Sequence, residues 1–128
     1  VIISAGGDGK RMGAKVPKQF LLLKGRPILM HTLEAFYHYD SDCQLILVLP
    51  EDQIAHWKTL CEAHAFDLAH EIVAGGKERF HSVQNGLKIT KGSLIAVHDA
   101  VRPLVADSVI TACFDAAQEW GAAVPVMP

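Results

Sequence analysis

Three clusters of glycine and charged residues in this 128-residue chain have the composition of a site for phosphorylated ligands. They are GGDGKR at residues 6–11, GGKER at residues 75–79 and HDAVRP at residues 98–103. Glycine lets a backbone approach a ligand closely, and Lys and Arg side chains can pair with phosphate oxygens. Each cluster alone is also typical of an ordinary surface turn, so the hypothesis depends on whether the fold brings them together.

The first cluster fits neither of two common phosphate-binding motifs. Gly7 and Gly9 have the spacing that begins G-x-G-x-x-G, but Gly13 comes one residue late for a dinucleotide site. The ATPase P-loop requires Ser or Thr after Gly-Lys, and this chain has Arg11 there. What remains is a glycine-rich turn with backbone N–H groups and nearby cations, among them Arg11 and Lys18, which suits a triphosphate.

The other two clusters allow both a functional and a structural interpretation. Gly75 and Gly76 could admit a flat ligand such as a base, or could mark a turn from strand to helix. The hydroxyl of Ser82 could bind a ligand or cap its own helix. Asp99 could accept a hydrogen bond from a ribose hydroxyl or help to hold a metal ion, and Arg102 could bind a second phosphate. The alternative for these last two residues is a solvated ion pair at the end of a strand.

The elements that must position these clusters alternate between strand and helix. We expect strands at residues 1–4, 44–49, 70–74, 93–97 and 122–126, and helices at residues 28–39, 51–66, 78–89 and 107–120. A short extended piece is expected at residues 19–23. Pro27 suits the first turn of the helix at 28–39, and Asp107 or Ser108 suits the N-cap of the last helix.

This alternation predicts a doubly wound α/β fold, with a mainly parallel sheet and helices on both faces. The loops that follow parallel strands lie along one edge of the sheet, so the three clusters should form one site there. The loop at residues 50–53 follows the second strand and carries no comparable cluster.

Composition excludes several other classes of protein. The net charge of −2 gives no general attraction to nucleic acid or to an anionic membrane, and no apolar run reaches membrane-spanning length. Cys43, Cys61 and Cys113 lack the spacing of a disulfide or metal pair, which favours small buried hydrophobes in a reducing cytoplasm. Only Cys61 and His64 have ligand spacing, and two ligands on one helix do not make a closed zinc site.

The stretches AGGDGKRMGAKVPKQFL, GGKERFHSVQNGL and HDAVRP together resemble the sugar-alcohol-phosphate cytidylyltransferases, in the right order and over essentially the whole chain. The wording GGKER favours the branch that acts on 2-C-methyl-D-erythritol 4-phosphate. The resemblance implies a Rossmann-like nucleotidyltransferase fold and transfer of CMP from CTP to the sugar-alcohol phosphate, with release of pyrophosphate. It also implies Mg²⁺ or another divalent cation. A ribitol-5-phosphate cytidylyltransferase and a non-catalytic nucleotide-binding module remain as alternatives.

The resemblance also implies roles for individual residues. Arg11 and Lys18 would contact the phosphates and stabilise charge at the reacting phosphorus, as catalytic residues. Asp99 would lie by the ribose and Mg²⁺, and Arg102 toward the second substrate. The remaining residues would bind the nucleotide, the first four around CTP and the last three at the cytosine: Ala5, Gly6, Gly7, Gly9, Gly76, Lys77 and Ser82.

Two residues depart from the family pattern. Asp8 places an acid in a phosphate loop, and Lys77 stands where the family often has Asp. Family members also continue beyond the position of residue 128, through a dimerisation arm and a later Lys. Residues 1–128 are therefore expected to be a single nucleotide-binding domain that is truncated on its C-terminal side, from a protein that is a homodimer at full length.

Overall fold

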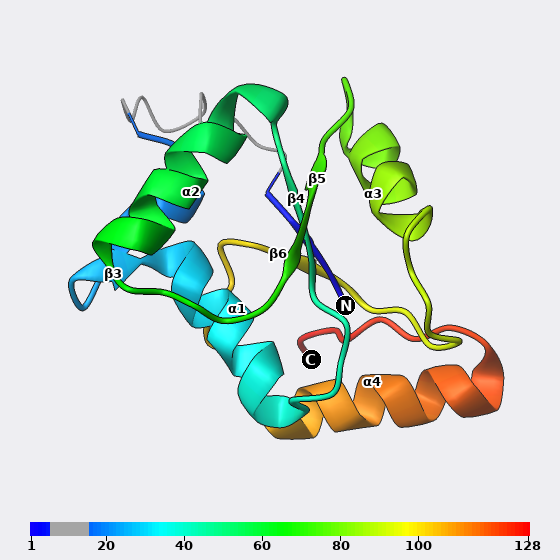
Figure 1. The fold of residues 1–128 in the computed structure, drawn as a ribbon. Helices are drawn as coiled ribbons and strands as arrows, with labels where there is room; N and C mark the ends of the chain where they lie inside the picture. Colours follow the sequence, from blue (N-terminus) through cyan, green and yellow to red (C-terminus); the bar gives the residue numbers. More distant parts are fainter. Residues whose placement is uncertain (6–15) are drawn as a thin grey trace.

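The computed structural model describes residues 1–5 and 16–128 (Figure 1). The predicted site residues Gly6, Gly7, Gly9 and Arg11 therefore lie outside the described residues. Within the described ranges, a four-stranded parallel sheet is accompanied by a small two-stranded antiparallel sheet, four α-helices and two 3₁₀ turns.

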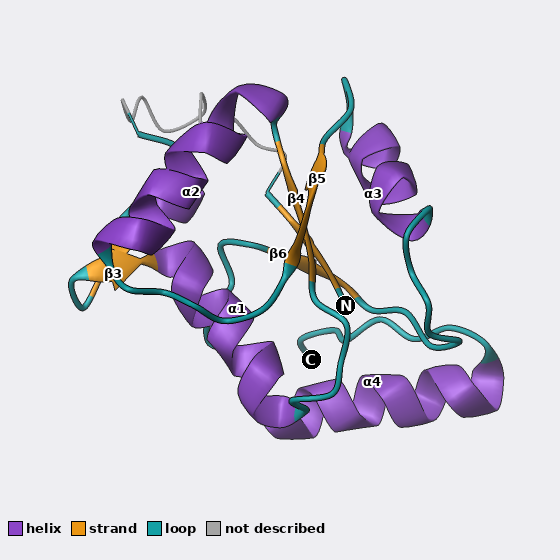
Figure 2. Cartoon of the chain, in the orientation of Figure 1, coloured by secondary structure: helices purple, strands orange, loops and turns teal. Residues whose placement is uncertain are grey.

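The elements follow one another in the predicted alternation (Figure 2). The strands of the main sheet are β1 (Ile2–Ser4), β4 (Ile46–Leu49), β5 (Glu71–Ala74) and β6 (Val97–Asp99). A hairpin pairs β2 (Leu22–Leu23) with β3 (Arg26–Pro27). The 3₁₀ turns are η2 (Lys18–Phe20) and η3 (Glu51–Gln53), and the helices are α1 (Ile28–Tyr39), α2 (Ile54–Ala63), α3 (Arg79–Leu87) and α4 (Asp107–Trp120).

The main sheet has the order β5-β4-β1-β6, and every neighbouring pair is parallel. From β1 the chain passes outward through β4 to β5, and then returns across the sheet to pair β6 with the other side of β1. The winding direction thus reverses between β1 and β6, where the register pairs Ser4 with Asp99. This topology confirms the doubly wound α/β fold, and its switch point lies beside the third cluster.

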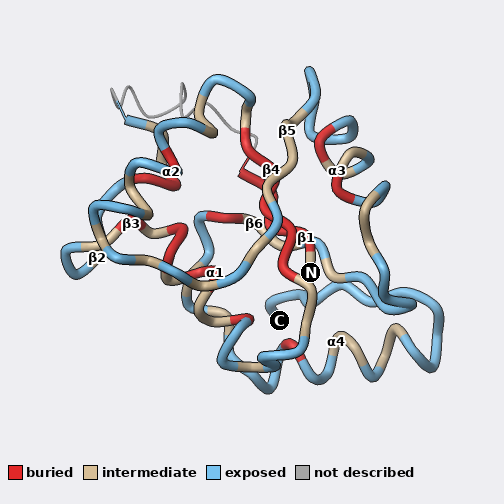
Figure 3. Tube along the Cα trace, in the orientation of Figure 1, coloured by how far each residue is buried: buried red, intermediate tan, exposed pale blue. Residues whose placement is uncertain are grey.

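Two hydrophobic layers cover the sheet, because alternate residues of a strand point to opposite faces. The buried residues concentrate along the central strands β1 and β4 (Figure 3). On one face Ile3, Leu47 and Leu49 form the larger core with side chains of α1, α2 and α4. On the other face Ile2, Ile46 and Val48 form a smaller cluster. Helix α3 lies on this second face, where Gly86 admits it closely: a Cβ at Gly86 would lie 3.0 Å from Cγ2 of Ile2.

The last two expected strands differ from the structure. The strand expected at residues 93–97 begins only at Val97 and ends at Asp99, because its register is set by pairing with β1. Asp99 is therefore the last residue of a strand rather than the first residue of a loop. The strand expected at residues 122–126 does not form. Gly121, at φ 91°, ends α4. The segment after it is exposed and is not paired with β6. Pro125 in this segment lacks the backbone N–H that a strand would donate.

Three local expectations are also corrected. Helix α4 has the expected bounds, but its N-cap is Ala106, with no side-chain capping bond, rather than Asp107 or Ser108, so Asp107 is the first helical residue. Pro27 is the N-cap of α1 rather than a residue of its first turn. Residues 19–23 are not one extended piece: Gln19 and Phe20 belong to η2, because both side chains are buried against neighbouring elements.

The three cysteines are free and half-buried, rather than fully buried as expected. Burial nevertheless raises the pKa of the Cys61 thiol to about 11, and it also raises the pKa of Cys43. Both thiols are thus poor nucleophiles near neutral pH. In the described part of the chain, no helix combines the length and the apolar character needed to cross a membrane.

Candidate active site

The second and third clusters meet through Asp99 at the carboxyl edge of the sheet. Nη2 of Arg79, the first residue of α3, lies 2.7 Å from Oδ1 of Asp99, at the end of β6. Nε of Arg102 donates to Oδ2 of the same carboxylate at 2.9 Å. One carboxylate thus joins two guanidinium groups from segments that lie far apart along the chain. Sequence reasoning expected Arg102 near Asp99 but assigned no role to Arg79.

The charge state of Asp99 follows from two opposing influences. Burial alone would raise its pKa, but the hydrogen bonds and charges of Arg79 and Arg102 outweigh burial and lower the pKa below its ordinary value. Asp99 is therefore an anion at neutral pH. Its Oδ1 atom is buried, and its partner among the described residues is the guanidinium of Arg79 at 2.7 Å.

Backbone and helix contacts fix the loop that carries Asp99 and Arg102. The N–H of Ala100 donates to the carbonyl of Ser4 at 3.0 Å, and the buried hydroxyl of Thr32 on α1 donates to the carbonyl of Ala100 at 2.6 Å. Nε2 of His98 lies 2.8 Å from the carbonyl of Arg102. The loop is thus held to β1 and α1 while its two charged side chains face the edge of the sheet.

In the second cluster, the contacts of Gly76 fit a turn from strand to helix, which is the structural alternative that the sequence left open. The N–H of Gly76 donates to Oγ of Ser82 at 3.1 Å, so this buried hydroxyl fixes the turn into α3. A Cβ at Gly76 would lie 2.3 Å from Cβ of His81, which explains the glycine by packing alone. The hydroxyl proton of Ser82 is still available for a ligand, and Lys77 is exposed beside it.

The first cluster is described only at its two flanks, Ala5 and Lys18. Ala5 is buried directly after β1, and its N–H donates to the carbonyl of Val48 at 2.9 Å. Lys18 begins η2, a turn whose next two residues are buried. Nε2 of Gln19 donates to the carbonyl of Ala5 at 3.4 Å and to Oε1 of Gln53 at 2.7 Å. These contacts connect Ala5 with the turn that carries Lys18. Gln53 lies in the loop after β4, a loop from which the sequence predicted no site residue.

A buried polar atom without a partner among the described residues lies at the same edge. It is Oγ of Ser4, the residue that β-sheet register pairs with Asp99. Unpaired buried polar groups are costly, and they concentrate where a ligand later supplies the missing partner. Among the described residues, no three His, Cys, Asp or Glu side chains lie together as a complete metal site. Asp99 is the one carboxylate among the predicted site residues that the structure describes.

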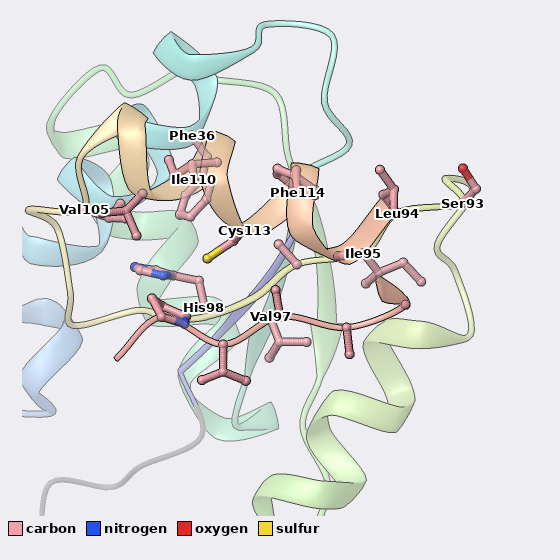
Figure 4. Close-up of a pocket in the computed structure, with 18 residues that line it drawn as sticks. Phe36, Ser93, Leu94, Ile95, Val97, His98, Val105, Ile110, Cys113 and Phe114 are labelled. Atoms are coloured by element: carbon pink, nitrogen blue, oxygen red, sulfur yellow. The ribbon is translucent and has the colours of Figure 1, made fainter. Parts of the chain in front are cut away.

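An apolar cavity lies elsewhere (Figure 4). It has a volume of about 520 Å³ and lies between α4, β6 with the residues that precede it, and the segment at 121–125. Phe36, Ile110 and Phe114 line one side, and Ile95 and Val97 the other. None of the predicted site residues that the structure describes lines this cavity, so it is not the site of the charged chemistry.

Comparison with known proteins identifies the family. A family model described as 2-C-methyl-D-erythritol 4-phosphate cytidylyltransferase, IspD, matches residues 1–128. The chain belongs to the IspD family. A relative of that name from Phocaeicola vulgatus is 56% identical over 128 residues, which cover 99% of this chain and 58% of the relative. Another from Azobacteroides pseudotrichonymphae is 54% identical over 129 residues and is likewise covered to 58%.

Solved structures of the IspD family share the fold. The 2-C-methyl-D-erythritol 4-phosphate cytidylyltransferase from Thermus thermophilus aligns with a TM-score of 0.76 at 31% identity, over 99% of this chain and 53% of that one. The 4-diphosphocytidyl-2C-methyl-D-erythritol synthase from Anaerococcus prevotii aligns with a TM-score of 0.70 at 26% identity, over 92% and 50% of the two chains. The chain thus spans little more than half the length of these relatives.

Proposed function

We propose that the protein, at its full natural length, transfers CMP from CTP to 2-C-methyl-D-erythritol 4-phosphate and releases pyrophosphate, as a step of isoprenoid biosynthesis. Membership of the IspD family and the names of its relatives support this activity. The structural observation that best supports the proposal is that Arg79 and Arg102 both form ion pairs with Asp99 at the switch point of the sheet. Open α/β sheets bind their ligands at that point.

The reaction requires positioning and positive charge more than covalent chemistry. A phosphate oxygen of the sugar-alcohol phosphate attacks the α-phosphorus of CTP, and the bond from that phosphorus to the bridging oxygen of pyrophosphate breaks. Arg11 and Lys18 are proposed to stabilise the charge that develops on the α-phosphoryl oxygens. Arg102 is proposed to bind the phosphate of the second substrate, to which its guanidinium could turn from Asp99.

Asp99 is proposed to accept a hydrogen bond from the ribose or to contact Mg²⁺. The lowered pKa of Asp99 keeps its carboxylate ionised, which fits such a ligand. Mg²⁺ is commonly held by one or two carboxylates together with substrate phosphates, so a single protein carboxylate is sufficient. The ion would neutralise phosphate charge and orient the triphosphate.

The nucleotide-binding roles of the remaining residues stay part of the proposal. Ala5 and the glycine-rich loop that follows it are proposed to surround CTP, with Gly76, Lys77 and Ser82 near the cytosine. Because the backbone N–H of Gly76 already bonds Ser82, a base would be recognised by the remaining hydroxyl proton and by neighbouring backbone groups. A homodimeric state and a cytoplasmic location are likewise proposed.

An assay of pyrophosphate release tests the activity. The full-length protein is mixed with CTP and Mg²⁺ and with either 2-C-methyl-D-erythritol 4-phosphate or ribitol 5-phosphate. We expect release with the methylerythritol compound and little with ribitol phosphate. Equal or better use of ribitol phosphate would replace the proposed substrate, and CTP binding without release from either compound would indicate a non-catalytic nucleotide-binding module.

A further inference from the structure

The side chain of Gln19 is a deeply buried polar group near the candidate site, at 2% exposure. A buried amide is costly unless it is hydrogen-bonded, so such a residue is kept for the contacts that it makes. Gln19 connects three segments: its own turn η2, the end of β1 through the carbonyl of Ala5, and η3 through Gln53. Nothing in the reaction chemistry described above uses this side chain.

The hydrogen-bond chemistry fixes which atom of Gln19 faces which partner. A backbone carbonyl can only accept, so the group near the carbonyl of Ala5 must be the NH₂ of Gln19. That NH₂ has two protons, which match the two acceptors: the carbonyl of Ala5 at 3.4 Å and Oε1 of Gln53 at 2.7 Å. The donor is therefore specific to glutamine at this position, and a carboxylate of the same shape would present only acceptors.

The two ends of this connection have a particular place in the candidate site. Ala5 is the last described residue before the glycine-rich loop, and Lys18 is the neighbour of Gln19 in the same turn. Phe20, on the other side of Gln19, stacks on the buried ring of Trp57 in α2, with ring centroids 6.1 Å apart. The turn is thus held to α2 by Phe20, and to the start of the loop by Gln19.

We propose that Gln19 is a positioning residue, which sets the placement of Lys18 relative to the start of the glycine-rich loop. This inference rests on the proposed function, in which the loop and Lys18 act on one triphosphate. Two groups that act on the same phosphorus must keep their mutual geometry in the transition state, and a displacement near 1 Å can cost roughly a hundredfold in rate. Loss of the NH₂ donor removes the contact that holds η2 to Ala5.

The chain offers a matched control in Gln44. Its amide also connects separate segments, because Nε2 donates to Oε1 of Glu71 at 2.8 Å and to the carbonyl of Ile89 at 2.9 Å. Its Oε1 accepts from the N–H of Lys91 at 2.9 Å. Gln44 precedes β4 and so lies at the amino edge of the sheet, opposite the candidate site. Losing this amide should affect folding stability without changing the placement of Lys18.

The test compares Gln19→Glu, Gln19→Met and Gln44→Met in the full-length protein, with kcat and KM for CTP measured by pyrophosphate release and Tm by thermal unfolding. In Gln19→Glu, Gln53 can turn its own amide to donate to the carboxylate, so mainly the Ala5 contact is lost. Gln19→Met removes both contacts without adding a charge. We expect both Gln19 variants to lower kcat at least about tenfold while KM for CTP changes less than about threefold. Gln44→Met should lower Tm and keep kcat within about twofold of wild type.

Two results overturn the inference while leaving the proposed function intact. One is a wild-type kcat, within about threefold, in both Gln19 variants. The other is an equal loss of kcat in Gln44→Met, which would show that general destabilisation explains the Gln19 result. A wild-type protein that releases no pyrophosphate overturns the proposed function and this inference with it.

Discussion

At the scale of single residues, Lys18 is the described cation on which the proposed chemistry depends most. It begins η2 and is half-buried, so its side chain leaves a turn that is anchored by its buried neighbours. A preorganised cation acts in the transition state more than in substrate binding. We expect Lys18→Ala to lower kcat on the order of a hundredfold or more, with a smaller change in KM for CTP. Normal turnover of this variant in the pyrophosphate assay would show that Lys18 has no catalytic role.

The ion pairs of Asp99 make a second prediction at this scale. Burial raises the pKa of Asp99, and Arg79 and Arg102 lower it, so removing one arginine should raise the pKa. We expect Arg79→Met to raise the pKa of Asp99, which an NMR pH titration of its carboxyl group would measure. Arg79→Lys is the control that keeps a positive charge and should give a smaller rise. An unchanged pKa in Arg79→Met would mean that the contact with Arg79 is not maintained in solution.

The same pKa shift sets the direction of a pH effect on stability. The pKa of Asp99 is lower in the folded chain than its ordinary value of 3.8, so ionised Asp99 favours the folded state. This stabilisation is present above about pH 4 and is lost as the pH falls through the lower, folded-state pKa. Asp99→Asn, which cannot ionise, should therefore lose less stability than wild type between neutral and strongly acidic pH.

At the scale of elements, Gly76 explains how the second cluster is built. A Cβ at Gly76 would lie 2.3 Å from Cβ of His81, and the displaced residue would also break the bond from the Gly76 N–H to Ser82. We expect Gly76→Ala to destabilise the fold by about 1–3 kcal/mol in urea unfolding. Gly92 is the matched control, because a Cβ there would meet only the carbonyl of Leu94 at 3.5 Å. Gly92→Ala should change stability by less than about 0.5 kcal/mol, and equal effects would contradict the packing argument.

The elements that could be predicted from sequence are those whose own residues determine them. Helix α1 has the predicted bounds, since its apolar spacing and the preceding Pro27 are local signals. The predicted strand at 93–97 failed because Leu94 and Ile95 are apolar enough for a strand, while the pairing with β1 selects Val97–Asp99 instead. Register depends on a partner strand that is distant along the chain, and a single sequence does not contain that information.

The candidate site, too, could be predicted from the sequence only in part. That the clusters would lie along the carboxyl edge followed from parallel strands alone, and the structure confirms it for the described residues. Arg79 and Gln19 were missed because their partners, Asp99, Ala5 and Gln53, are brought to them only by folding. An arginine at a helix start and a glutamine after a lysine have no local signature of such a role. The functions of all these residues remain predictions.

At the scale of the whole molecule, several large apolar side chains around β6 and α4 are exposed. Strand β6 forms an edge of the sheet, paired with β1 among the described strands, and Val97 is 45% exposed. Leu104 and Trp120 are 89% and 77% exposed, and the cavity of about 520 Å³ opens beside the same strand. Exposed apolar patches and free strand edges are ordinarily covered by further chain or by a partner.

These side chains lie near the part of the candidate site that is proposed to hold the second substrate, because Asp99 ends β6 and Arg102 follows it. The chain spans 58% of the length of its relatives, and in-line transfer needs the second substrate held from both sides of the switch point. We therefore expect a protein of residues 1–128 alone to bind CTP weakly and to turn over negligibly, whereas the protein at the full length of its relatives is an active homodimer. Sedimentation and pyrophosphate release, measured on both lengths, test this expectation. A monomeric and fully active protein of residues 1–128 would show that Asp99 and Arg102 complete the second-substrate site without further chain.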